Sequence, residues 1–396
     1  MSLNLDKSAW KRVSLGEVVR HVTDRVDAET SGLQRFLAGE HIPSGSLTIS
    51  DWGVIGRDPI GPMFYKRFKP GHVLYVSRRT YLRKVAVPEF EGITGEKTFV
   101  LETLDSNVLL QEFLPFALSA ERFHSYAIVN SRGSVNPYLN WGELAAYEFD
   151  LPPLNDQKRI ADLLWTVDRH QVELKACVLA TAGALQRFLG DAFSAASGPF
   201  VAIVDLCTDV IGGIWGSPEG EGEVDVLALG PRVYAPGTTS IVTDGSPVRS
   251  VSGRQAESRL VRAGDIILER SGGSPTQPVG RVVIAGPGIA PCIPTDFQRL
   301  LRPNRDIVEP RYLFWRLRHD WTKGLTRNYS KKTTNITNLS VKDYIAREIR
   351  VPSLADQNLL LSRVSAFEIG LTSVSAELSA FGALRSSLLA DIFGRN

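Results

Sequence analysis

Residues 149–193 read FDLPPLNDQKRIADLLWTVDRHQVELKACVLATAGALQRFLGDAF, and residues 349–393 read IRVPSLADQNLLLSRVSAFEIGLTSVSAELSAFGALRSSLLADIF. The two stretches align without a gap. The residues that recur unchanged near their ends are Pro152, Leu154, Asp156, Gln157, Leu189, Asp191 and Phe193, with the counterparts Pro352, Leu354, Asp356, Gln357, Leu389, Asp391 and Phe393. A repeat of this length indicates a tandem duplication.

Apolar residues in both stretches alternate at spacings of four and three, which is the pattern of a coiled-coil seam. The seam comprises Ile160, Leu164, Val167, Leu174, Val178 and Leu185 in the first stretch and Leu360, Val364, Phe367, Leu371, Val374 and Leu378 in the second. We predict one long helix per stretch, roughly 38 residues and about 57 Å in length. Neither helix can bury its seam alone, so the simplest solution pairs the two. The alternative is that each helix only covers its own neighbouring domain.

Prolines mark the start of each predicted helix, at Pro152 and Pro352. Asn155 or Asp156 in the first copy, and Asp356 in the second, are available as N-caps. Short runs of Val, Ile and Tyr bounded by Gly and Pro indicate strands in the remaining sequence. We therefore predict an α+β chain in which globular domains at residues 1–150 and 200–350 alternate with helices within 151–199 and 351–396.

Composition limits the class of protein. The chain has 396 residues, 43% hydrophobic and 22% charged, close to globular averages and unlike a disordered or fibrous chain. It lacks the uninterrupted apolar run of roughly 18 residues expected of a membrane span. Its cysteines, Cys177, Cys207 and Cys292, are far apart, which argues against a disulfide framework and favours a reducing compartment. We expect a cytoplasmic protein with no membrane partner.

Two basic stretches interleaved with aromatic residues predict local contact with nucleic acid, because the net charge is only +2. The first stretch contains Lys66, Arg67, Lys69, Arg78, Arg79, Arg83 and Lys84, and the second lies within residues 299–332. Polar segments at equivalent places in the two halves follow a predicted helix and precede a leucine. They supply Arg132, Ser134 and Asn136 in the first half and Arg327, Lys331, Lys332, Thr333 and Asn335 in the second. The alternative for each run is a solvated surface.

Catalytic motifs are missing from the sequence. It contains no G-x-x-x-x-G-K-[ST] phosphate loop, no H-E-x-x-H zinc motif and no G-x-S-x-G elbow. The segment Asn136-Pro137-Tyr138 lacks one proline of the loop that grips adenine in amino-methyltransferases, and no glycine-rich cofactor loop precedes it. The histidines are scattered without metal-ligand spacing. We therefore predict no catalytic residue, no metal site and no cofactor bound by this chain.

The motifs at residues 151–157 and 351–357, each ahead of a heptad helix, resemble the specificity (S) subunit of type I DNA restriction–modification enzymes. The resemblance covers essentially the whole chain. It implies two target recognition domains, each reading one half of a bipartite double-stranded DNA site, and two helices forming an antiparallel coiled coil with a pseudo-two-fold axis. Asp156 and Asp356 stand where the family commonly has Glu, and Ser353 replaces the second proline.

The resemblance also implies protein partners. Two methyltransferase (M) subunits would dock on the helices and motor-nuclease restriction (R) subunits would join them, so S-adenosylmethionine, ATP and Mg²⁺ would bind to those partners. On the helix flanks we expect Trp165, Arg169, Lys175, Arg363 and Glu368 to contact M subunits; for Trp165 the alternative is packing on its own globular domain. The rival functions are a self-sufficient DNA methyltransferase or nuclease and a coiled-coil scaffold that binds no nucleic acid.

Overall fold

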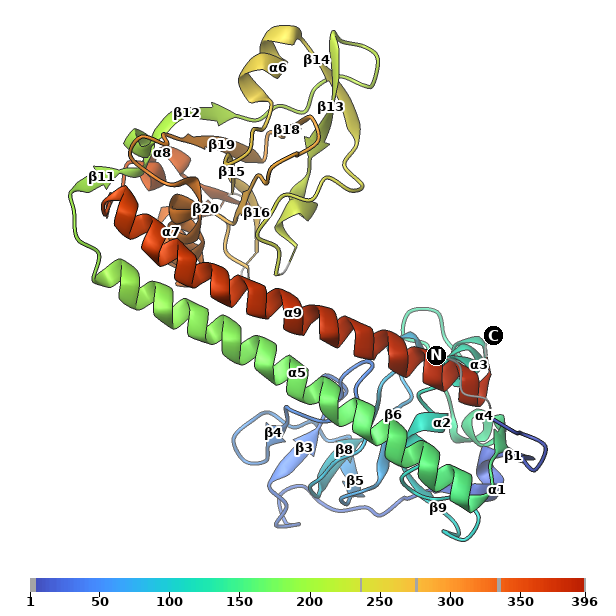
Figure 1. The fold of residues 1–396 in the computed structure, drawn as a ribbon. Helices are drawn as coiled ribbons and strands as arrows, with labels where there is room; N and C mark the ends of the chain where they lie inside the picture. The colour runs from blue at the N-terminus through green and yellow to red at the C-terminus, as the bar shows by residue number, and fades with distance from the viewer. Residues whose placement is uncertain (1–4, 236, 275–276, 333–335, 395–396) are drawn as a thin grey trace. The chain divides into compact units, whose positions relative to one another are not determined.

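The computed structural model describes residues 5–235, 237–274, 277–332 and 336–394. Its longest elements are two helices, α5 (Leu154–Ser194) and α9 (Leu354–Phe393), of 41 and 40 residues (Figure 1). The chain divides into two compact units. Unit 1 holds the residues up to 178 and those from 373 onward, and unit 2 holds residues 179–372. Each unit therefore contains a globular part and one end of each long helix.

Unit 1 is built on two small sheets with the strand orders β2-β9-β6-β7 and β4-β3-β8-β5, and on the pair β1-β10. Its strands are β1 (Lys11–Ser14), β2 (Val19–His21), β3 (Arg35–Leu37), β4 (Gly53–Val54), β5 (Phe64–Phe68), β6 (Val73–Val76), β7 (Val85–Ala86), β8 (Gly92–Gly95), β9 (Thr98–Thr103) and β10 (Glu148–Leu151). Its shorter helices are α1 (Leu15–Val18), η1 (Thr80–Leu82), α2 (Leu114–Ala117), α3 (Glu121–Val129) and α4 (Trp141–Ala145).

Unit 2 repeats this plan with the orders β12-β19-β15-β17, β14-β13-β18 and β11-β22, and adds the sheet β16-β21-β20. Its strands are β11 (Phe200–Ala202), β12 (Cys207–Gly212), β13 (Val224–Leu229), β14 (Val248–Val251), β15 (Ile266–Glu269), β16 (Ser271–Gly273), β17 (Val282–Ile284), β18 (Cys292–Pro294), β19 (Gln298–Pro303), β20 (Ser330–Lys332), β21 (Thr337–Leu339) and β22 (Glu348–Arg350). Its shorter helices are η2 (Ile203–Leu206), η3 (Pro231–Tyr234), α6 (Gly253–Arg259), α7 (Pro310–Thr322), η4 (Leu325–Tyr329) and α8 (Val341–Ile345).

The matching strand orders confirm the duplicated α+β fold predicted from the repeat. The parallel pair β3–β8 in unit 1 corresponds to the parallel pair β13–β18 in unit 2. In both units, the strand entering the unit pairs antiparallel with the strand that leads into a long helix, as β1–β10 and β11–β22.

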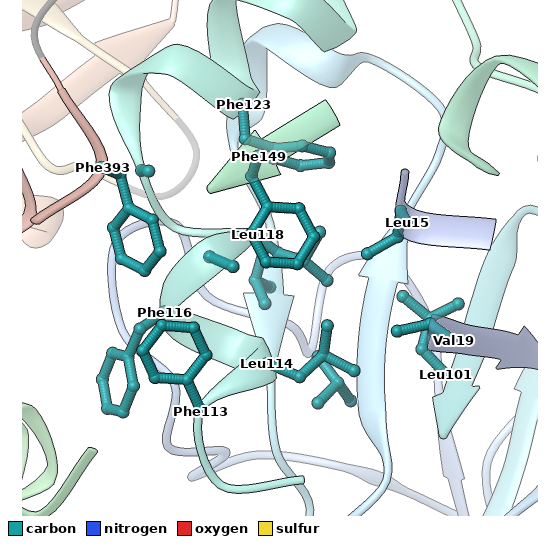
Figure 2. Close-up of a cluster of buried hydrophobic side chains, with 14 of the residues drawn as sticks. Leu15, Val19, Leu101, Phe113, Leu114, Phe116, Leu118, Phe123, Phe149 and Phe393 are labelled. Atoms are coloured by element: carbon teal, nitrogen blue, oxygen red, sulfur yellow. The ribbon is translucent and has the colours of Figure 1, made fainter. Parts of the chain in front are cut away.

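The core of unit 1 contains residues from the globular part and from both long helices. Phe113, Leu114, Phe116 and Phe123 are fully buried there, and Figure 2 shows them with Phe393 of α9 in the same cluster. The rings of Phe113 and Phe393 have their centroids 5.6 Å apart. Ile160 and Leu164 of α5 belong to this core as well, so the helix also covers its own domain, as the alternative interpretation proposed.

Within each unit the ends of the long helices pack together. In unit 1, His170 of α5 contacts the ring of Phe381, with centroids 4.4 Å apart, and Arg385 Nε donates to Asp168 Oδ1 at 2.5 Å. In unit 2, Phe188 and Phe367 have centroids 5.7 Å apart. The pairing in unit 1 runs antiparallel. Every predicted seam residue is buried or half-buried.

The repeated glutamine of the proline motif attaches each long helix to its globular part. Gln157 Oε1 accepts from the Leu110 amide at 2.9 Å, and its Nε2 donates to Val108 O and Pro152 O. Gln357 makes the same set with the Glu309 amide, Ile307 O and Pro352 O. Both side chains are buried.

The predicted N-caps are wrong in both copies, because Asn155 and Asp156 lie inside α5 and Asp356 lies inside α9. Helix α9 begins at Leu354, so Ser353 is the capping residue. The Ser353 hydroxyl accepts from the Asp356 amide at 3.2 Å and donates to Asp356 Oδ2 at 2.7 Å. Asp356 therefore lies in the first turn of α9, where its negative charge stabilises the helix by interacting with the positive end of the helix dipole.

Helix α9 is long and apolar enough, by length and composition alone, to cross a membrane. Its ends instead join globular cores, through Leu361 and Val364 in unit 2 and Leu388 and Ile392 in unit 1. Core helices pass the same compositional test, so the composition of α9 is weak evidence for a membrane span.

Candidate nucleic-acid interface

A hairpin at residues 130–138 brings the predicted DNA-facing segments of unit 1 together. Arg132 and Tyr138 exchange backbone hydrogen bonds of 2.9 Å in both directions, and Gly133 makes the turn with a φ of 95°, which favours glycine. The Arg79 amide donates to Pro137 O at 2.6 Å. The hairpin therefore rests on the turn after β6, although more than 50 residues separate Arg79 from Asn136.

Side chains fix the hairpin further. Arg79 Nε donates to Asn136 Oδ1 at 2.7 Å, and the hydroxyls of Thr80 and Ser131 lie 2.8 Å apart. Arg79 and Arg83 have φ values of 55° and 54° and are the non-glycine residues with positive φ in the described chain. Such backbone strain persists only where the surroundings impose it and is concentrated at functional sites.

Unit 2 presents the same arrangement as a regular sheet. In unit 2, Asn338 is the strand partner of both Ser271 and Lys331. In unit 1, Tyr138 forms β-bridges with both Arg78 and Arg132 in the same way. Lys331 is thus equivalent to Arg132, and Ser271 to Arg78. Lys331 and Arg327 are exposed and Lys332 belongs to β20, while Thr333 and Asn335 lie outside the described residues.

The prediction that Lys66 contacts nucleic acid is wrong. It is 6% exposed, and its Nζ donates to Glu96 O and Thr98 O at 2.6 and 2.9 Å. Burial lowers the pKa of Lys66 to about 8. The ammonium group satisfies backbone carbonyls inside unit 1 and is not available to a phosphate.

Several other predicted basic residues are exposed or half-buried but already have partners. Arg67 pairs with Glu91 at 2.9 Å, and Arg83 pairs with Glu121 at 2.6 Å. Lys84 donates to Gly39 O. Arg132 pairs with Glu143 at 2.5 Å.

Among the predicted basic residues of unit 1, two carry no such pairing. Arg78 and Lys69 are exposed, and within the described chain neither has a carboxylate at salt-bridge distance. Ser134 and Asn136 at the hairpin tip are exposed as well.

Two residues predicted to contact M subunits pack on their own globular parts. Trp165 Nε1 donates to Glu112 O at 3.0 Å, and its ring meets Phe116 edge-on at 5.2 Å. Glu368 pairs with Arg311 of α7. Both side chains remain half-buried, and their contact with M subunits stays a prediction. Arg169, Lys175 and Arg363 are exposed.

Two residues near the hairpin were missed by sequence reasoning. The Lys97 ammonium lies 4.9 Å from the centroid of the Tyr138 ring, a cation–π geometry. Val135 at the hairpin tip is 82% exposed. The position of Lys97 depends on how β9 and its neighbours pair, so no local pattern reveals it.

In the part of the chain that the structure describes, no group of three or more His, Cys, Asp or Glu side chains is placed to hold a metal ion. Burial raises the pKa of the Cys207 and Cys292 thiols to about 12, so both stay protonated and unreactive near neutral pH. Burial lowers the pKa of His21 to about 4.

Residues 39–181 match the model of the type I restriction modification DNA specificity domain. The chain is similar to the crystal structure of the S subunit of a type I restriction-modification system from M. genitalium. The two are 14% identical with a TM-score of 0.62, and the match covers 100% of this chain and 99% of that one. A chain from a study of complex assembly and conformational transition of the type I R-M system is 20% identical with a TM-score of 0.58, covering 98% of both chains. No curated protein matches the sequence.

Proposed function

We propose that this chain, a member of the type I restriction–modification DNA specificity family, reads a bipartite double-stranded DNA site with one half-site per globular unit. The observation that carries the proposal is the recurrence of the hairpin. The Arg78–Tyr138–Arg132 arrangement of unit 1 reappears as Ser271–Asn338–Lys331 in unit 2.

The exposed groups on these hairpins suit both the binding of DNA phosphates and the recognition of bases. Lys and Arg neutralise phosphates and release counterions, whatever the base sequence. Asn can bind adenine and Arg guanine in the major groove, each good bidentate contact contributing roughly 1–3 kcal/mol of discrimination. The hydrogen bond from Arg79 to Asn136 holds the two side chains in a fixed geometry, which reduces the entropy lost on binding.

Catalysis belongs, in this proposal, to partner subunits. Two M subunits dock on the long helices, where Arg169, Lys175 and Arg363 are exposed and Leu179 and Ile369 are exposed apolar side chains. R subunits complete the restriction enzyme. S-adenosylmethionine, ATP and Mg²⁺ would bind to those partners, and the complex would act in the cytoplasm.

DNA binding by the full chain assembled with M subunits tests the proposal. Replacing Lys331 and Lys332 by alanine should weaken binding and reduce the salt slope by about 0.9 for each phosphate that the variant no longer neutralises. Arg254→Ala is the matched control, since Arg254 is exposed on α6. Unchanged affinity and salt slope in the lysine variant would remove these residues from the interface.

Exchange of residues 200–350 with a related domain tests the division of labour. Mapping of methylated adenines should then show one half-site altered and the other retained. A change in both halves, or a single uninterrupted site, would overturn the two-reader proposal. Turnover or S-adenosylmethionine binding by the purified chain alone would favour the methyltransferase alternative, and salt-insensitive or absent DNA binding would favour the scaffold.

A further inference from the structure

A cavity of about 370 Å³ lies in unit 2 directly beside the end of the hairpin. Arg270, Arg299, Lys342 and Ser340 are among its lining residues. The Leu339 amide, at the end of β21, donates to Arg270 O at 2.8 Å. The cavity therefore lies at the end of β21, which is one of the two strands of the hairpin.

The side chains that line the cavity carry positive charge. Its lining contains three basic side chains and no carboxylate. Within the described chain none of the three has an acidic group at salt-bridge distance, although Arg281 and Arg302 of the same unit do.

Arg299 is the least solvated of these cations. It is half-buried and uses Nη1 to donate to Gln298 O at 2.8 Å. Burial, followed by the charge of Arg270, lowers the pKa of Arg299, with Asp296 opposing the shift. A partly desolvated guanidinium next to a second one is costly unless an anion compensates both charges.

Unit 1 has a cavity of about 280 Å³ at the equivalent place. There the Leu139 amide donates to Ser77 O at 2.9 Å, as Leu339 does to Arg270 O. Arg25, Lys66 and Lys97 line this cavity, together with Glu96. Arg25 and Lys97 are therefore the basic side chains that recur at this place, because Lys66 donates to backbone carbonyls.

We propose that the unit 2 cavity binds one phosphodiester of the DNA backbone, with Arg299 and Arg270 as the donors. Arginine suits this ligand because its planar fork can donate two parallel hydrogen bonds to phosphate oxygens. A phosphate seated here fixes the register of the duplex beneath the hairpin, while base contacts from the tip select the sequence. This inference rests on the proposed function, since it requires the hairpin to face DNA.

The test uses the full chain assembled with M subunits and duplexes in which single phosphates of the unit 2 half-site are replaced by uncharged methylphosphonates. For the wild type, one replacement should weaken binding about tenfold or more, the effect of losing a charged hydrogen bond. In Arg299→Gln the same replacement should weaken binding severalfold less than in the wild type, because one of the two donors is already gone. Arg254→Gln, which removes the same charge from α6, should behave as the wild type.

The outcomes separate the inference from the proposed function. If the wild type binds with strong salt dependence but no linkage is coupled to Arg299 or Arg270, the phosphate site is wrong and DNA reading stands. Absence of salt-dependent binding by the wild type rejects the proposed function itself. Should thermal melting show that Arg299→Gln does not fold, Arg270→Gln decides the question, since Arg270 is exposed.

Discussion

Replacing Gln357 by leucine should destabilise unit 2 by about 3 kcal/mol. The side chain is fully buried and makes hydrogen bonds of 2.8 Å to the Glu309 amide, 3.2 Å to Ile307 O and 2.9 Å to Pro352 O. Each bond contributes about 1 kcal/mol net, and backbone groups left buried without a partner add to the loss. Leucine keeps much of the volume, so the creation of a cavity contributes little.

Urea unfolding of the full chain, followed by circular dichroism, measures this loss. With a slope of about 2 kcal/mol per molar urea, a loss of 3 kcal/mol moves the midpoint of the unit 2 transition by about 1.5 M. Asn358→Ala is the control: Asn358 is the next residue along the helix and is exposed, so its change should stay within about 0.5 kcal/mol. A midpoint for Gln357→Leu that matches the control would refute the role assigned to the motif.

Burial lowers the pKa of His124 to about 4 from the ordinary value of 6.5; protonation therefore favours the unfolded state, and His124 should contribute on the order of 2 kcal/mol to the stability that unit 1 loses on going to pH 5. Urea unfolding at pH 7.5 and pH 5 should show a loss smaller by that amount in His124→Gln than in the wild type. Arg385→Ala should cost unit 1 about 3–5 kcal/mol by leaving the buried Asp168 charge unpaired, and the double variant with both residues replaced by leucine should recover most of it; no recovery in urea unfolding would contradict the pairing. Val135 at the exposed hairpin tip should contact a thymine methyl group, so replacing that thymine by uracil should weaken binding about fourfold in a competition assay. Val135→Ala should abolish the difference, and equal discrimination by both proteins would exclude the contact.

Periodicity predicted the long helices correctly because a heptad pattern reports directly which face is buried. It did not predict what covers the other faces. Trp165 lies off the seam and was expected to meet another protein, yet Phe116 and Glu112 of its own unit cover it. A sequence shows that a side chain is large and apolar, but the choice between an internal and an external neighbour depends on tertiary packing.

The burial of Lys66 follows from the alternation of side chains along its strand. In β5 it lies two residues before the buried Phe68 and is itself buried, and side chains two apart in a strand share a face. The alternation therefore places Lys66 on the buried face of the strand, although it belongs to the first basic stretch. Gln157 and Gln357 bind backbone groups nearly 50 residues away. No local sequence pattern reports such distant contacts, so the repeat identified the two glutamines as equivalent but did not predict their partners.

The pairing of the entering and leaving strands has a consequence for inheritance. Because β1 lies against β10 and β11 against β22, the chain enters and leaves each globular part at neighbouring points. The coding segment between those points behaves as a cassette: a recombined allele with a different interior is still joined to the helices at the same two positions. Under the proposed function, exchange of this segment would change one DNA half-site in a single step, without compensating changes in the helices that flank it.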